Sequence, residues 1–182
     1  MDAMRTGVAA TLLVSALTAL PGCARAGSDG ERQAGDALSV AMPAATLGVE
    51  LWRQEWTGAK QFGESFVVTM AATEVLKRTT HVERPDGTDD RSFPSSHAAS
   101  AFSAATYVHR RYGLQDAWPL YAMATYVGYT RVQADRHTWG DVAGAAGVAA
   151  LSSWWLVDPA QPAVQVAIAR KAMFVGWSIP LQ

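Results

Sequence analysis

Two long stretches without a charged residue set the strongest limit on what this chain of 182 residues can fold into. They are residues 117–130 and 142–157, and a charged residue stands just outside each end of both. Each is therefore shorter than the run of about 20 apolar residues that a helix needs to cross a bilayer. The second is rich in Ala and Gly, which let neighbouring helices approach closely. We predict that both are buried core helices, with Trp154 and Trp155 in the core, of a compact, mainly α-helical bundle.

Other segments also carry helical signals. Residues 37–52 are apolar enough for one helix, or for two short helices if Pro43 interrupts them. Residues 59–78 place large apolar side chains at near-helical spacing and end in two basic residues, which suit a helix C-terminus. A helix also fits residues 95–111, because this segment begins with two serines, natural N-cap residues. In the tail, residues 164–168 alternate apolar with small or polar side chains, which permits a C-terminal β-hairpin.

The N-terminus has the pattern of an export signal, assigned to residues 1–23. A weakly charged start precedes a short apolar run and then Leu-Pro-Gly-Cys, which resembles the bacterial lipobox and makes Cys23 the candidate lipidation site. The alternatives are cleavage by an ordinary signal peptidase near Ala24 or Ala26, and an uncleaved N-terminal anchor. Residues 24–35 are small and polar and predict a flexible tether, so the folded domain is assigned to residues 36–182. We expect an exported protein of the bacterial periplasm or cell envelope, with a lipid anchor if Cys23 is modified.

Charge and cysteine content exclude several classes of function. The chain has 15 Lys and Arg against 16 Asp and Glu, and it lacks a basic tract with interleaved aromatic residues. Nucleic acid is therefore not an expected partner. Cys23 is the only cysteine, so neither a disulfide framework nor a thiolate metal site is available. Any attraction for anions must come from a local cluster.

Residues suited to hold a phosphate group occur in three clusters, each in a loop or at the end of a predicted helix. The clusters are Lys77 with Arg84-Pro85, then Pro94-Ser95-Ser96-His97, then Arg131 with His137 and Asp141. Arg binds phosphate through a two-pronged fork and Lys as a point charge. A helix N-terminus adds free backbone N–H groups and a favourable dipole. Together the three clusters predict a site for a phosphate dianion.

Two histidines and one aspartate within these clusters suit phosphoryl transfer. His137 and Asp141 are one helical turn apart, so the carboxylate can hold one imidazole nitrogen and leave the other free. That is the arrangement of a nucleophile with its orienting partner. His97 is the candidate that gives a proton to the leaving oxygen and later activates water. Asp141 has a competing interpretation, because Thr138 and Asp141 also fit a helix capping box.

The spacing of these residues resembles a known family signature. Its three parts are Lys77-x6-Arg84-Pro85, Pro94-Ser95-x-His97 and Arg131-x5-His137-x3-Asp141. It is similar to the signature of the type 2 phosphatidic acid phosphatase superfamily, which also contains bacterial class A acid phosphatases and vanadium haloperoxidases. The resemblance implies a helical bundle of the acid phosphatase and vanadium haloperoxidase type, and hydrolysis without a metal or other cofactor.

The resemblance also assigns roles to individual residues. His137 corresponds to the phosphohistidine nucleophile, Asp141 to its orienting partner and His97 to the general acid. The implied oxyanion ligands are Lys77, Arg84, Ser95 and Arg131, joined by backbone amides near Ser96 and His97. The family usually has Gly in place of Ser96. We expect Ser96 to be the first residue of a helix, which gives it a negative φ and preserves its amide donor.

The leading hypothesis is a metal-independent phosphatase with a histidine nucleophile. Its substrate is a lipid phosphate or pyrophosphate held at a membrane surface, or a soluble phosphate monoester. One alternative is a haloperoxidase that binds vanadate in the same pocket. Another is a non-catalytic envelope lipoprotein that binds phosphorylated lipid. The sequence makes no prediction about the oligomeric state.

Overall fold

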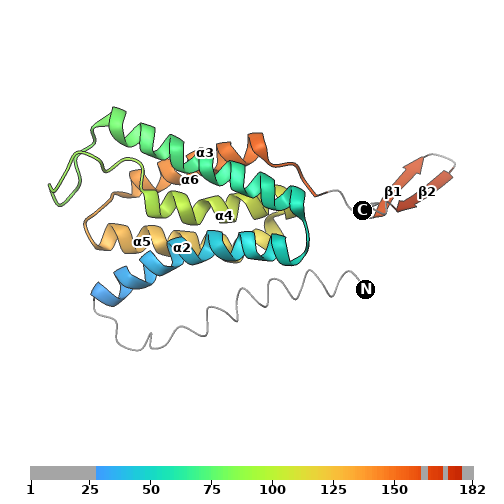
Figure 1. The fold of residues 1–182 in the computed structure, drawn as a ribbon, viewed down its shortest axis with the longest axis horizontal. Coiled ribbons are helices and arrows are strands. Elements are labelled where there is room, and N and C mark those ends of the chain that lie inside the picture. Colours follow the sequence, from blue (N-terminus) through green and yellow to red (C-terminus); the bar gives the residue numbers. More distant parts are fainter. Residues whose placement is uncertain (1–27, 161–163, 170–171, 178–182) are drawn as a thin grey trace.

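The computed structural model describes residues 28–160 and the backbone of two strands, residues 164–169 and 172–177. The described residues form a mainly α-helical structure, as predicted (Figure 1). Its elements are α2 (Ser28–Trp52), α3 (Trp56–Thr80), α4 (Ser96–Tyr112), α5 (Leu114–Gln133), α6 (Trp139–Leu156), β1 (Val164–Ala169) and β2 (Ala172–Trp177).

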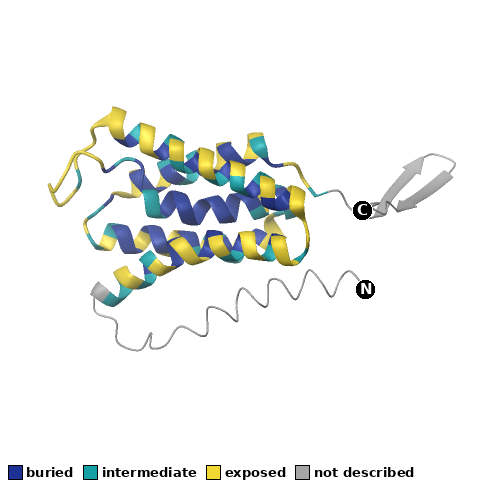
Figure 2. Cartoon of the chain, in the orientation of Figure 1, coloured by how far each residue is buried: buried dark blue, intermediate teal, exposed yellow. Residues whose placement is uncertain are grey.

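Helix α4 is the centre of the bundle and contacts each of the other four described helices. Helices α3 and α6 lie on one side of it, and α2 and α5 lie on the other (Figure 1). Figure 2 shows buried residues along most of its length. Small side chains make this burial feasible, because alanines let four neighbours approach one helix. The alanines of α4 without exposed surface are Ala98, Ala99, Ala101, Ala104 and Ala105.

The two charge-free stretches form α5 and α6, but each of these helices buries only one face. Trp154 and Trp155 are 67% and 83% exposed, so their prediction as core residues is wrong. The face of α6 that packs on the bundle carries small residues such as Ala145 and Ala149, while the two tryptophans lie on its exposed face. Within the described residues, no helix combines the length and the hydropathy needed to span a membrane.

Helix α2 corrects the predicted domain boundary. It begins at Ser28 and continues without a break through Pro43, so a flexible tether over residues 24–35 is wrong from Ser28 onward. Composition was misleading because contacts with other helices hold this polar segment. A β-carbon at Gly35 would overlap Thr130 Oγ1, so glycine allows α2 to lie directly against α5. The predicted signal segment and Cys23 lie outside the described residues.

The C-terminal segment contains the β-hairpin that its alternating sequence pattern permits. Strands β1 and β2 pair antiparallel, with Val164 opposite Trp177 and Ala169 opposite Ala172.

Candidate active site

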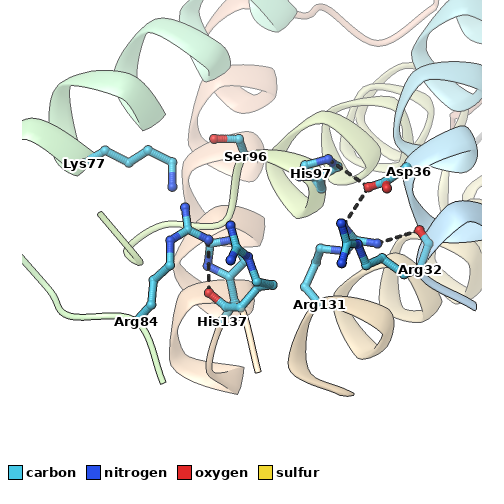
Figure 3. Close-up of a pocket in the computed structure, with 9 residues that line it drawn as sticks. Arg32, Asp36, Lys77, Arg84, Ser96, His97, Arg131 and His137 are labelled. Atoms are coloured by element: carbon cyan, nitrogen blue, oxygen red, sulfur yellow. Dashed lines mark hydrogen bonds and ion pairs between the residues drawn. The ribbon is translucent and has the colours of Figure 1, made fainter. Parts of the chain in front are cut away.

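A pocket of about 310 Å³ opens at one end of the bundle, where α3 and α5 end and where α4 begins. Most of the predicted phosphate-site residues meet there, from segments far apart in the sequence (Figure 3). The loop between α3 and α4 contributes Arg84, and the loop between α5 and α6 contributes Arg136 and His137. The full lining comprises Arg32, Asp36, Lys77, Arg84, Ser96, His97, Arg131, Arg136 and His137.

His137 is buried at the inner side of the pocket, with 4% of its surface exposed. Burial lowers its pKa to about 4, and the positive charges of Lys77 and Arg84 act in the same direction. The imidazole is therefore neutral at pH 7 and carries a free lone pair. Its Nδ1 lies 3.7 Å from Asp141 Oδ2 and 3.5 Å from Ser92 Oγ. This leaves Nε2 as the nitrogen available for chemistry in the pocket.

Asp141 forms the capping box that the sequence indicated and also lies beside the His137 ring. Its Oδ2 accepts a hydrogen bond from the backbone N–H of Thr138 at 2.7 Å, and its own N–H donates to Thr138 Oγ1 at 3.2 Å, which completes a capping box. The same Oδ2 accepts a hydrogen bond from Ser92 Oγ at 2.6 Å and faces the His137 ring. The capping interaction therefore fixes the carboxylate that lies beside the imidazole.

Two of the predicted cations, Lys77 and Arg84, reach the pocket from α3 and from the loop that follows it. Lys77 Nζ donates to the carbonyl of Arg91 at 2.9 Å, and burial followed by the charge of Arg84 lowers its pKa. Arg84 donates to Asp89 Oδ1 at 2.7 Å and to the carbonyl of Arg136 at 3.2 Å. Hydrogen bonds to Arg91, Asp89 and Arg136 therefore orient Lys77 and Arg84, and both side chains remain part of the pocket lining. A phosphate dianion placed there would meet both charges.

Two adjacent serines have different positions. Ser95 is fully buried and is the N-cap of α4, where its Oγ accepts a hydrogen bond from the N–H of Ala98 at 3.4 Å. It is not among the residues that line the pocket, and its hydroxyl caps α4, so phosphate binding by the Ser95 hydroxyl stays a prediction. Ser96 is the first residue of α4 and does line the pocket. The non-glycine residues with positive φ in the described part of the chain do not include Ser96, which confirms its predicted backbone conformation.

His97 stands across the pocket with 42% of its side chain exposed. Its Nε2 lies 3.0 Å from Asp36 Oδ1. Burial lowers the pKa of His97, and the charge of Arg131 lowers it further, whereas Asp36 raises it. Because Asp36 also contacts Arg131, these three groups form one connected set.

Four residues at the site were missed by the sequence interpretation: Arg32, Asp36, Ser92 and Arg136. Arg32 and Asp36 lie in the first turns of α2, and no local pattern connects them to a motif more than forty residues away. Ser92 lies in the loop before α4 and likewise carries no local signal. Arg136 directly precedes His137, and that proximity was the one available signal. Among the described residues there is no group of three or more His, Cys, Asp or Glu arranged to hold a metal ion.

Comparison with known proteins gives a consistent family assignment. The model of the PAP2 superfamily matches residues 58–162, a range that holds Lys77 to Asp141 but excludes Asp36. A lipid A 1-phosphatase of Porphyromonas gingivalis is 38% identical over 81 residues, which is 41% of this chain and 18% of that protein. A lipid A 4′-phosphatase of Helicobacter pylori is 32% identical over 115 residues, 57% of this chain and 58% of that protein. The chain thus spans less than two thirds of both relatives, and no solved structure matches it significantly.

Proposed function

Because the chain belongs to the PAP2 superfamily, we propose that it is a phosphatase that hydrolyses a phosphorylated lipid through a phosphohistidine at His137. The observation that carries this proposal is a buried histidine, neutral at pH 7, in a pocket lined by Lys and Arg. Both relatives are lipid A phosphatases by name, which supports a lipid as the substrate class. A soluble phosphate monoester is the alternative substrate.

Binding begins with the charge of the phosphate group. Lys77 and Arg84 lie on the side of His137, and Arg131 lies on the side of His97 (Figure 3). A phosphoryl group between the two histidines would have its non-bridging oxygens close to these three cations, which offset the charge that develops during transfer. The first backbone amides of α4, at Ser96 and His97, add donors without a partner inside the helix.

The proposed chemistry has two steps. In the first, Nε2 of His137 attacks phosphorus, the ester P–O bond breaks, and His97 gives its proton to the leaving alcohol oxygen. In the second, His97 takes a proton from water, the water oxygen attacks phosphorus, and the P–N bond breaks to release inorganic phosphate and free His137. Asp141 offsets the positive charge on the imidazole while it carries the phosphoryl group. No step uses a metal ion, so we expect EDTA to leave turnover unchanged.

The proposed location is the bacterial cell envelope, at a membrane surface. The export pattern of residues 1–23 supports it, as does the lipid substrate named for both relatives. Trp139 is 52% exposed and lies two residues after His137, so it offers an apolar surface to the lipid portion of a substrate near the pocket. Lipidation of Cys23 would hold the enzyme at the same surface.

The test is a panel of phosphate esters that includes long-chain lipid phosphates, assayed with the full chain. We expect His137→Ala to lower turnover by at least about 1000-fold, since it removes the attacking atom. His109→Ala is the matched control, because His109 is exposed on α4 and bonds Tyr121 at 3.0 Å, outside the pocket lining. Activity retained by His137→Ala on every ester would contradict the proposal. Halide oxidation with added vanadate would instead indicate the haloperoxidase, and phosphate binding without turnover the non-catalytic lipoprotein.

A further inference from the structure

A carboxylate from α2 joins the two groups on one side of the pocket. Asp36 Oδ1 lies 2.6 Å from Arg131 Nη1 and 3.0 Å from His97 Nε2, so a single oxygen serves both (Figure 3). Arg131 Nη2 donates to the backbone carbonyl of Arg32, one turn earlier on α2, at 2.7 Å. The first turns of α2 therefore contact a proposed phosphate ligand and the proposed general acid together.

The position of Asp36 is fixed from two sides. At Gly35, the residue before it, a β-carbon would overlap Thr130 and lie 3.0 Å from Arg131 Nη2, so glycine brings α2 against α5 at this point. On the other side, Ser100 Oγ of α4 donates to the backbone carbonyl of Ser39 at 2.6 Å. Because α5 carries Arg131 and α4 carries His97, these two anchors set the distances from Asp36 to both groups.

We propose that Asp36 is a positioning residue of the reaction proposed above, one that orients Arg131 and keeps His97 in the protonated form that the leaving oxygen requires. The inference rests on the proposed function of the site. Its basis is the geometry of the shared oxygen, which accepts from the guanidinium of Arg131 and from Nε2–H of His97, and whose negative charge favours the imidazolium over the neutral ring. Asp36 lies on α2, outside residues 58–162 that the superfamily model matches.

The charges around His97 explain why such a partner is needed. An imidazole among several cations loses its proton readily, because a like charge disfavours its charged form. Burial and Arg131 are the largest causes that lower the pKa of His97, and Asp36 opposes them. The charged and titratable groups that face His97 or share its pocket are Arg32 and Asp36 from α2, Lys77 from α3, Arg84 from the following loop, Arg131 from α5, and Arg136 and His137 from the loop before α6.

The experiment is a titration of the His97 imidazole by NMR in the full chain, together with the pH dependence of turnover on a phosphate ester. Asp36→Asn keeps the shape of the side chain and removes its charge. We expect it to lower the titration midpoint of His97 and to move the high-pH limb of the kcat profile to lower pH. At neutral pH kcat should fall by about tenfold, less than the loss expected when a general acid is removed outright. Asp36→Glu should restore the midpoint and the high-pH limb at least in part.

A second histidine–carboxylate pair supplies the control. His81 Nδ1 lies 2.8 Å from Asp90 Oδ2 on the surface of the loop after α3. Asp90→Asn should leave kcat and the titration of His97 unchanged. If Asn disturbs the helix, Asp36→Ala repeats the measurement with the residue of highest helix propensity.

Two results would overturn the role of Asp36. One is an unchanged His97 midpoint in Asp36→Asn. The other is tighter inhibition by inorganic phosphate with a higher kcat/KM, which would show that Asp36 merely competes with substrate for Arg131. The titration needs no turnover, so it still decides the pairing of Asp36 with His97 if the wild-type chain proves inactive. Inactivity on the whole ester panel would instead count against the proposed function.

Discussion

The two ends of the bundle bury charged side chains in different ways. At the end away from the pocket, Glu50 is 1% exposed, and its two carboxylate oxygens accept hydrogen bonds from the Tyr112 hydroxyl at 2.8 and 2.9 Å. Arg111 beside it donates to Gln61 at 3.2 Å and contacts Glu55 at 3.4 Å. Carboxylates and cations are thus paired within one closed network, which links α2, α3 and α4.

At the pocket end the charges are not balanced. Five Lys or Arg side chains line the pocket but only one carboxylate does, although Arg84 and Arg136 also pair with Asp89 and Asp86 outside the lining. The pKa values of Lys77, His97 and His137 are all lowered, with burial as the largest cause in each. Such a lining would favour an anion, because an anion offsets the mutual repulsion of the cations. We therefore expect the charged groups at the far end to contribute to stability and those at the pocket to contribute to binding. Functional sites often carry such a cost in stability.

Two buried arginines give the sharpest test of this difference, because their side chains are similarly exposed, 5% for Arg131 and 7% for Arg111. Arg131→Met should lower kcat/KM by roughly 100- to 1000-fold, the loss expected when one group that stabilises the transition state is removed. Its free energy of unfolding should change by less than about 1 kcal/mol, because burial of the guanidinium is itself unfavourable and its partner Asp36 is 44% exposed, so water can solvate that carboxylate in the variant. Steady-state kinetics and urea denaturation measure the two effects.

Arg111→Met should show the opposite result. It removes a buried cation whose charge acts on buried Glu50 and whose side chain donates to Gln61 and contacts Glu55, so we expect a loss of about 3 kcal/mol. Turnover per folded molecule should stay within about twofold of wild type, since Arg111 is at the far end of α4 from His97. Urea denaturation and an assay corrected for the folded fraction provide the measurement. Comparable losses of activity in both arginine variants would remove the distinction between the two ends.

The pH dependence of stability should also separate the ends. The pKa of His137 is lowered to about 4 from an unfolded value of about 6.5. The unfolded chain therefore binds this proton more tightly, so the stability from neutral His137 is present above about pH 6.5 and is lost as the pH falls through about 4. We expect a loss of about 2 kcal/mol over this window after allowance for solvent screening. Thermal unfolding of wild type and His137→Gln at several pH values measures it, and the variant should show a flatter profile.

Glu50 should contribute with the opposite sign, because burial raises its pKa. Its contribution is fully present below the unfolded value of about 4.5 and is lost as the pH rises through the higher folded value. Glu50→Gln should therefore lack the loss of stability that wild type shows as the pH rises through the folded pKa of Glu50. Equal effects of the two variants on the pH profile would show that the ends do not titrate separately.

Much of the fold was predictable because local signals agreed with the final packing. The apolar spacing of residues 59–78 and the serines that begin residues 95–111 place α3 and α4 to within a few residues. The tether was wrong because nothing local shows that Gly35 fits against Thr130. The two tryptophans of α6 were wrong for a related reason, since hydrophobicity alone does not tell which face of an apolar helix is covered.

The residues of the site also separate into those with a local sequence signal and those without one. Lys77, Arg84, His97 and His137 were found because their chemistry and spacing are visible in one stretch of sequence. Asp36 was not, because its role depends on the distance between two helices that are far apart in the chain. Ser95 was predicted as a cap from its place before an alanine-rich helix, and the structure confirms that role; its contact with phosphate stays a prediction.

The smallest expected effects are those of substitutions at the two adjacent serines, one of which lines the pocket while the other caps α4. Ser96→Gly introduces the residue that is usual in the family, and we expect kcat/KM to change by less than about threefold. The reason is that Ser96 already has a helical backbone without positive φ, so glycine adds conformational freedom but no new amide donor. The free energy of unfolding should fall by less than about 1 kcal/mol.

Ser95→Ala is the comparison, because it removes the N-cap of α4 and should cost about 1 kcal/mol of stability. Kinetics with phosphate as inhibitor, and urea denaturation of both variants, measure the pair. An increase in kcat/KM above about tenfold in Ser96→Gly would mean that the Ser96 side chain obstructs the phosphate. In that case the Ser96 side chain would weaken phosphate binding, although the backbone amides at the N-terminus of α4 are placed to donate to the phosphate.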